Sequence, residues 1–544
     1  MTPAQIKRKW DLLKADRTNV EGLWDLIEQF CLPFRGEFFR DNSTEQEVDW
    51  RKRQIYDSTA VVAAQNLAAA IQSNMINPAT RWFEMAFQEQ ELNQDDDARE
   101  WLEECATIVY NGLNESNFNQ EAAESILDMV GFGTTVIVEE VDERGKRPKL
   151  DFSSMPIKEV CFEESADGGL LGLYRELKYT ALQCEEKFGL ENLPSVVSDK
   201  LGTSEEGKQR FTVIFAIYER RDKNPDPAAK ILAAKERRWA SKYILYDTTE
   251  NIGEEGGYYE MPAFVPRFRR TSGSKWGHGP AAVAMADILS LNELVETVLE
   301  NAAKAVDPPT LVTKRGLLST LDLGRGGLTV VKSLDQIKDY VTGARFDVAA
   351  LTVENLQASI RGCFFVDQLE LKDSPAMTAT EAHIRYELMQ RLLGPTAARF
   401  ITDWLNPCVS RTFNIYYRAG LLPEMPDQVR QLRGTFGIEY TGPMARSHKR
   451  EVAMSINGWV QSLVELGGVL PDVLDTPDPD KLALVMGINQ GVPAQVMRSQ
   501  KEIEEVRKAR QEAQQAQQEA ELNKTQGQAN QSNAMAAAAG QTIQ

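Results

Sequence analysis

The sequence predicts a mainly helical α+β subunit, and three observations lead to that prediction. Apolar residues follow helical spacing in two long segments, residues 279–306 and 351–365. These segments bracket a short insert that is punctuated by proline and glycine. Between about 150 and 268, runs of alternating apolar and polar residues predict half-buried antiparallel strands instead. No catalytic motif accompanies these patterns, so we interpret the chain first as a structural component.

Length and charge narrow the class of protein. A chain of 544 residues, 42% hydrophobic and 26% charged, can bury a sizeable core divided among several subdomains. Its net charge of −19 argues against a general nucleic-acid coat, because neutralising phosphates requires an excess of basic residues. A negative wall does, however, repel phosphates and lets a duplex slide without sticking. An acidic conduit for DNA therefore stays among the candidate functions.

The cysteines and the N-terminus predict the compartment. Six cysteines are scattered without a C-x-x-C pair, which favours reduced, buried thiols in a reducing cytoplasm. The first ten residues include basic side chains but no apolar run after them, and no window reaches 18 consecutive apolar residues. We expect neither a signal peptide nor a membrane-spanning segment.

The N-terminal part predicts helices from Pro3 to about Gln29 and from Tyr56 to Ile71, and a strand at 82–87. A further helix, Glu121 to Val130, leads through Gly131-Phe132-Gly133 into a strand. This G-x-G invites a phosphate-binding interpretation, but a dinucleotide fold needs the strand before the glycines and the helix after them. We predict a plain helix-to-strand turn. With no P-loop motif in the sequence, we expect no ATP hydrolysis by this chain.

We also predict no metal site and no cofactor. The three histidines are far apart in sequence, and none belongs to an H-E-x-x-H motif. They are His278, His383 and His448.

The central region predicts two helices that hold out a small insert. The first helix would be about 39 Å long at 1.5 Å per residue, and Asp307-Pro308-Pro309 ends it. Acidic residues occupy its other faces: Asp287, Glu293, Glu296 and Glu300. The insert to about Ala350 suggests short strands with tight turns, and it is too small for much of a core, so copies of itself are expected to complete it. Its basic cluster of Lys314, Arg315 and Arg325 is either solvated charge or a docking rim for an acidic partner.

A polar loop follows the second helix and ends in a capping box. Thr378 and Glu381 have the spacing at which a threonine oxygen and a glutamate satisfy first-turn amides. The long helix that starts there contains Pro395 and Pro407, which predict kinks or breaks. Farther on, we predict helices at about 451–467 and 481–487. Finally, a polar Gln/Ala-rich helix at 501–520 precedes a low-complexity, flexible tail.

Taken together, four of these motifs resemble the head-to-tail connector, or portal, of short-tailed (podovirus-type) bacteriophages. They are the alanine-rich helix trailed by residues 77–83, the turn at 131–135, the Gly277-x-Gly279-Pro280 start of the long helix, and residues 378–387. The match covers most of residues 1–500 by order of elements. Each motif is moderately specific, and their combination is much more so.

The resemblance implies a ring, usually of twelve subunits, at one capsid vertex. Each subunit would have an outer wing, stem, clip, channel loop and crown. The implied regions are a wing at 1–280, β-rich at about 150–268; stem helices at 281–306 and 351–366; a clip at 307–350; a channel loop at 367–378; a kinked helix and wing return at 379–440; crown helices at 441–500; and a polar crown extension with a flexible tail at 501–544. The DNA-facing candidates in the loop would be Asp367, Gln368, Glu370, Lys372, Asp373, Ser374 and Met377. Whether Lys372 contacts phosphate or pairs with an acidic neighbour stays open, and the pairing is favoured.

The resemblance also implies a location in the virion, after assembly in the host cytoplasm. The partners would be other copies of the chain, the major capsid protein, a scaffolding protein, the terminase large subunit, tail adaptors and internal core proteins. Double-stranded DNA would pass without sequence specificity during packaging and ejection, and no membrane would be involved. The alternatives are a cytoplasmic oligomeric scaffold that never conducts DNA and, third, a phosphate-handling hydrolase using residues 131–133.

Overall fold

The computed structural model describes the chain in stretches separated by gaps. The described residues are 1–35, 54–78, 81–89, 92–93, 95–142, 148–203, 206–220, 232–306, 310–312, 337–339, 346–366, 394–432, 436–440, 443–468, 476–490, 492, 496, 498, 502–518 and 523–524. They mix helix and sheet with helix predominating, as predicted. Two compact units divide the chain: the first comprises 1–82 and 108–422, and the second comprises 83–107 and 423–544.

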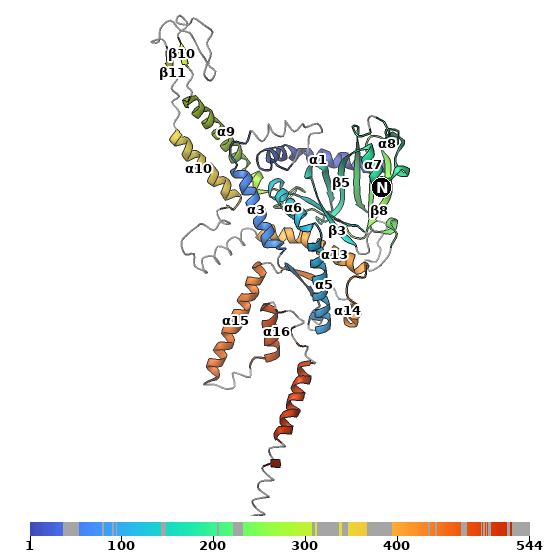
Figure 1. Ribbon diagram of the computed structural model, residues 1–544, viewed down its shortest axis with the longest axis vertical. Helices are drawn as coiled ribbons and strands as arrows, with labels where there is room; N and C mark the ends of the chain where they lie inside the picture. The colour runs from blue at the N-terminus through green and yellow to red at the C-terminus, as the bar shows by residue number, and fades with distance from the viewer. Residues whose placement is uncertain are drawn as a thin grey trace, which may run out of the picture. The chain divides into compact units, whose positions relative to one another are not determined.

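A five-stranded antiparallel sheet forms the β-rich part of the first unit (Figure 1). Its strands follow chain order across the sheet, and each one pairs antiparallel with the next. They are β4 (Val160–Glu164), β5 (Leu170–Thr180), β6 (Arg210–Glu219), β7 (Trp239–Leu245) and β8 (Glu250–Tyr258). The strand predictions for this region are confirmed.

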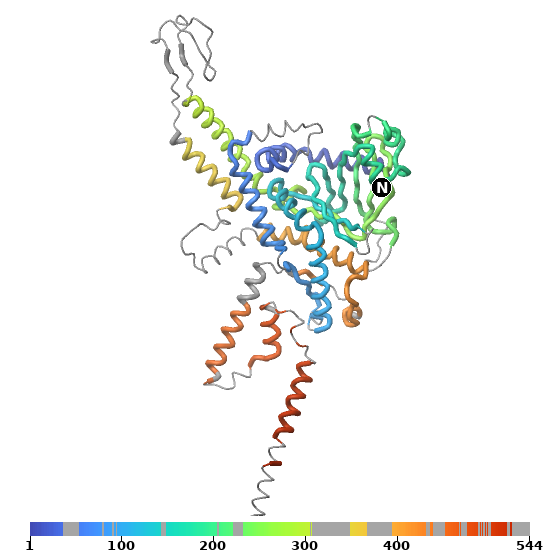
Figure 2. Tube along the Cα trace, in the orientation of Figure 1, coloured from blue at the N-terminus to red at the C-terminus, as the bar shows by residue number. Residues whose placement is uncertain are grey.

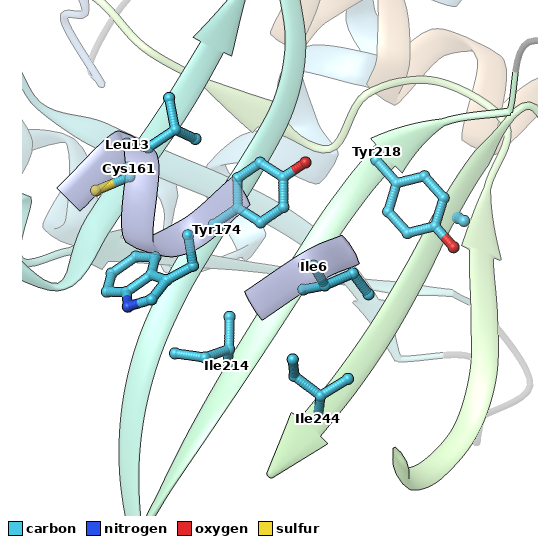
Figure 3. Close-up of a cluster of buried hydrophobic side chains, with 10 residues drawn as sticks. Ile6, Leu13, Cys161, Tyr174, Ile214, Tyr218 and Ile244 are labelled. Carbon is cyan, nitrogen blue, oxygen red and sulfur yellow. The ribbon is translucent and has the colours of Figure 1, made fainter. Parts of the chain in front are cut away.

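Helices cover both faces of this sheet. Helix α1 (Pro3–Phe30) begins at a capping box on Thr2 and places Ile6 and Leu13 against the sheet (Figure 3). Helices α7 (Ala181–Phe188) and α8 (Ser195–Ser198) bury Cys184 and Val197 against the opposite face. A strand buried on both faces needs apolar residues at consecutive positions, and the central strand β6 has them from Val213 to Tyr218.

A second, three-stranded sheet has the order β3-β2-β9. Its strands are β2 (Val136–Asp142), β3 (Lys149–Met155) and β9 (Ala263–Phe264). Helix α6 (Phe118–Phe132) packs against β3 and ends at Gly133, whose φ of 79° lies in the left-handed region. The predicted helix-to-strand turn at 131–133 is therefore confirmed.

Helix α3 (Thr59–Met75) packs against α6 through small residues. Ala60, Ala64 and Ala68 are buried, and their size lets the neighbouring helix approach closely. The helix starts three residues later than predicted. Residues 54–57 precede it as a separate segment that hydrogen-bonds to two other helices, at Asn292 and Gln357.

The second unit joins segments that are far apart in sequence. Strand β1 (Phe83–Phe87) pairs antiparallel with β12 (Phe436–Tyr440), and helix α5 (Asp96–Glu115) starts in this unit and continues into the first. The unit also contains α14 (Asp427–Leu432) and a helical hairpin of α15 (Pro443–Gly467) and α16 (Pro479–Gln490). Both hairpin helices are longer than predicted.

Residues 502–518 form the predicted polar helix. Its Arg507 donates two hydrogen bonds, of 2.7 and 2.5 Å, to the carboxylate of Asp480 on α16. This bidentate pair ties the polar helix to the hairpin.

Candidate functional site: the paired helices α9 and α10

Two long helices lie side by side in the first unit (Figure 2). Helix α9 (Pro280–Val306) ends at the predicted residue, whereas α10 (Phe346–Cys363) starts five residues before the predicted Leu351. The apolar spacing becomes clear only after Ala350, but Asp347 favours a helix start and Val348-Ala-Ala continues it. Between the helices, short strands β10 (Thr310–Val312) and β11 (Ile337–Asp339) pair antiparallel, as predicted for the insert.

Four glycines hold the start of α9 against the end of α6, and we call Gly131, Gly133, Gly277 and Gly279 the glycine clasp. A Cβ on Gly279 would lie 2.3 Å from the Val130 carbonyl oxygen, and one on Gly277 would lie 2.2 Å from the Gly133 carbonyl oxygen. Both obstructing atoms belong to the backbone and cannot rotate away. Gly133, Gly277 and Gly279 are needed because two main-chain segments touch here.

Hydrogen bonds complete the clasp. The Gly277 N–H donates to Thr134 Oγ1 at 2.7 Å, and the His278 N–H donates to the Arg269 carbonyl at 2.7 Å. Beside them the Trp276 ring packs edge-on against Trp24, with centroids 5.0 Å apart. The base of α9 is thus held by backbone contacts and by aromatic packing.

Residues 54–57 tie α9 to α10, and we call this segment the strap. Asn292 on α9 accepts from the Tyr56 N–H at 2.8 Å and donates to the Gln54 carbonyl at 3.0 Å. Gln357 on α10 donates to Asp57 Oδ2 at 2.8 Å. Sequence reasoning missed the strap and assigned Tyr56 to the start of a helix. The only signal of the strap in the sequence was the Tyr56-Asp57 pair directly before Ser58, which occupies the N-cap position of α3.

The four acidic residues predicted for α9 have different surroundings. Asp287 accepts from Ser359 of α10 at 2.7 Å, and Glu296 accepts from the Tyr56 hydroxyl at 2.9 Å. That hydrogen bond to Glu296 raises the pKa of Tyr56. Glu293 and Glu300 are exposed, and Glu300 makes only a loose pair with Lys304 at 3.8 Å. Two of the four carboxylates therefore hold the pair together, and two face solvent.

Burial along α9 falls off toward its far end. Among the α9 residues whose exposure the structure describes, the buried ones lie in the first half of the helix: Pro280, Ala281, Ala284, Met285, Ile288 and Leu291. Beyond them, apolar side chains become exposed, with Leu299 at 53% and Val306 at 80%, and Leu351 on α10 is 61% exposed. The far part of the helix pair therefore presents apolar side chains to its surroundings, as Val283 also does nearer the base at 69% exposure.

The chain that continues beyond residue 393 is anchored to the first unit. A π-helix, Ile401–Leu405, precedes α13 (Asn406–Arg418), and Pro407 at its start confirms the predicted interruption there. Pro407 has no N–H for the carbonyl four residues earlier, so the turn widens. Asp403 in the π-helix pairs with Arg267 at 3.3 Å.

A buried charged cluster anchors α13. Glu139 on β2 is fully buried, accepts from Thr412 at 2.9 Å and lies 3.3 Å from the Arg411 Nε. Arg411 and Arg418 both pair with Glu260, so that two acids and two arginines meet. Burial raises the pKa of the Glu139 carboxyl to about 7, although the arginines oppose the shift. Sequence reasoning missed this cluster, because Glu139, Glu260 and α13 come from three segments that are more than 100 residues apart.

We expect Glu139 to make stability depend on pH. Its pKa is higher in the folded state than the unfolded value of 4.5, so its contribution falls as the pH rises between about 4.5 and 7. Between pH 5.5 and 7.5 the wild type should lose about 2 kcal/mol more unfolding free energy than Glu139→Gln. Urea unfolding at the two pH values measures this difference, and equal losses in the two proteins would contradict it.

The other predicted site residues lie outside the described part of the chain. This holds for all seven channel-loop candidates, for the cap residues Thr378 and Glu381, and for the basic cluster Lys314, Arg315 and Arg325. Their roles remain predictions.

Three further properties of the described residues concern the cysteine thiols, the possibility of a membrane-spanning helix and the possibility of a metal site. Five of the six free cysteines are buried as predicted and Cys363 is partly exposed; burial raises the pKa of Cys31 to about 12. None of the described helices combines the length and hydropathy that crossing a membrane requires. Within those same residues, no group of three or more His, Cys, Asp or Glu side chains is placed to hold a metal ion.

The helix pair, its clasp and its strap are structural features, which agrees with the predicted class of structural component. The model of the family described as "Bacteriophage head to tail connecting protein" matches residues 3–497, and the chain belongs to this family. The chain is 26% identical over 520 residues to the "Probable portal protein" of Bordetella phage BPP-1, covering 92% of this chain and 90% of that one. It is 24% identical over 538 residues to the "Portal protein" of Salmonella phage epsilon15, covering 97% and 92%.

The comparisons confirm the predicted role as a portal and head-to-tail connector. Portal proteins of phages are structural components of the virion rather than enzymes, so the hydrolase alternative is wrong. The turn at 131–133 accordingly serves packing in the glycine clasp and not phosphate binding.

Proposed function

We propose that about twelve copies of this chain form a ring at one capsid vertex, with the α9 and α10 helices as its stem. Double-stranded DNA passes through the ring during packaging, driven by a separate terminase motor, and leaves by the same path at infection. The tail attaches to the same ring. The major capsid protein, a scaffolding protein, tail adaptors and internal core proteins are the further partners.

The observation that carries this proposal is the exposure of apolar side chains on the far half of the helix pair. Leu299, Val306 and Leu351 are exposed in the part of the subunit that the structure describes. Fully burying one such side chain stabilises by about 1.5–3 kcal/mol. Identical helix pairs from neighbouring copies would bury these residues, and a repeated head-to-tail contact closes into a ring.

The exposed acidic residues support a passage for DNA. Glu293 and Glu300 face solvent on α9, and the whole chain carries a net charge of −19. A wall of this charge repels phosphates and lowers the friction on a moving duplex. The oligomeric scaffold is the alternative, and it would need no such wall.

The remaining regions of the proposal rest on the family and on the order of elements. Residues 1–280 and 379–440 would form the wing, 307–350 the clip and 367–378 the channel loop. The crown would comprise 441–500, extended by 501–544. In the clip, Lys314, Arg315 and Arg325 are proposed to meet the acidic face of a terminase or tail adaptor.

Native mass and projected shape test the proposal. Twelve copies of 61.0 kDa amount to 732 kDa, and we expect particles near that mass with an axial hole wide enough for a duplex. Mass photometry with negative-stain imaging measures both. A monomer or dimer at every salt and protein concentration would overturn the proposal, and a closed particle without a hole would favour the scaffold.

A further inference from the structure

The helical hairpin of α15 and α16 has long stretches without charge. From Val452 to Val464 on α15 there is no charged residue, and from Leu482 to Gln490 on α16 there is none either. The chain as a whole is 26% charged, so a solvated helix of this length should carry several charges. Depletion of charge, together with tryptophan and methionine, is typical of the centre of a protein interface.

Exposed apolar residues form a stripe along α15. Val452, Trp459 and Leu466 follow one another at seven-residue spacing and are 45%, 45% and 51% exposed. Seven residues make almost two helical turns, so the three side chains lie on one side of the helix. Ala453 and Leu463, a little farther around the helix, are buried. Met454 and Val464 are exposed as well, at 68% and 63%, but each lies on another side of the helix, so among these exposed residues only Val452, Trp459 and Leu466 form a continuous exposed stripe.

Helix α16 is apolar around its whole circumference. Leu482 and Met486 point to one side, while Leu484 and Val485 lie on others, and Val485 is 41% exposed. A helix that is apolar on every side belongs in a buried position. Among the described residues, α15 packs against one face of α16, and a second apolar helix would cover the rest.

We propose that the outer side of α16 in one copy packs against the Val452, Trp459 and Leu466 stripe of the next copy. Each chain offers both surfaces in equal number, so copies of this chain suffice to cover them. The surfaces differ, which makes the contact head-to-tail and lets it close around a ring. The inference rests on the proposed ring and adds a second band of subunit contact, separate from the stem.

Charge introduced on the stripe tests the contact. We expect Trp459→Glu to raise the protein concentration at which rings half-dissociate by at least tenfold, because it places a carboxylate in an apolar interface. Gln461→Glu is the matched control, since it adds the same charge at an exposed position on another side of the same helix. It should change that concentration by less than twofold. Mass photometry over a dilution series measures both.

Engineered cysteines give a second readout that does not depend on loss of assembly. Three double variants pair Val485→Cys with Val452→Cys, Trp459→Cys or Leu466→Cys. At least one should form disulfide-linked dimers and higher multimers on oxidation, seen on a non-reducing gel. Gln461→Cys with Val485→Cys should resemble the wild type, whose own cysteines are mostly buried.

The outcomes separate this inference from the proposed function. If wild-type rings form, Trp459→Glu rings dissociate like those of Gln461→Glu and no double variant is cross-linked, the α15–α16 contact is wrong while the ring stands. If the wild type forms no ring under any condition, both fail. Dissociation of the Trp459→Glu ring together with a specific cross-link supports the contact.

Discussion

Replacing Gly279 by alanine should lower the free energy of unfolding of the first unit by about 3 kcal/mol, the upper end of the usual cost of overpacking. The added Cβ would lie 2.3 Å from the Val130 carbonyl oxygen and 2.8 Å from that of Gly131. Since both are main-chain atoms, either α6 or α9 has to shift. Urea unfolding followed by tryptophan fluorescence measures the loss, because Trp276 packs beside the clasp.

Gly22→Ala supplies the matched control for the clasp. Gly22 is exposed in α1, and no atom lies within 4 Å of the Cβ that alanine would add. Alanine is favoured over glycine inside a helix, so this variant should gain up to about 1 kcal/mol. The same substitution is thus expected to change stability in opposite directions at the two sites. Equal stability of Gly279→Ala and the wild type would show that the clasp does not hold α9.

Local patterns in the sequence predicted α1 and α9 well, but they missed helix α5 and placed the start of α15 eight residues late. Helix α9 shows a clear apolar period and a proline stop, and its observed end at Val306 agrees with both. The weakly patterned start of α10 at Phe346 was placed five residues late. Capping residues and tertiary contacts together set where a helix begins and ends. Only the capping residues can be recognised from the local sequence.

Contacts between distant segments could not be predicted. Gly133 and Gly279 were both noticed, yet nothing in either G-x-G shows that the two touch across about 145 residues of chain. Glu139 gave a faint signal as an acid directly after the apolar strand Val136–Val138. Its partner Arg411 lies 272 residues farther along, and only the fold brings the two together.

The deletion of residues 367–377 has the largest functional effect that we expect. Rings should still assemble, because the clasp, the strap and the anchors of α13 lie outside the deleted residues. Packaging should fall to background, because the proposed channel loop would no longer retain the DNA. The measurement is nuclease-protected DNA per particle, with native mass as the check on assembly.

The Lys372→Ala variant distinguishes the effect of the lysine charge from the effect of removing the whole loop. If Lys372 pairs with Asp367, Glu370 or Asp373, as favoured, removing an exposed pair costs little and packaging should stay within twofold of the wild type. A loss as large as that of the deletion would instead assign the lysine to phosphate contact, where one charge-assisted bond is worth more. A deletion variant that packages a full genome would show that residues 367–377 are not the channel loop.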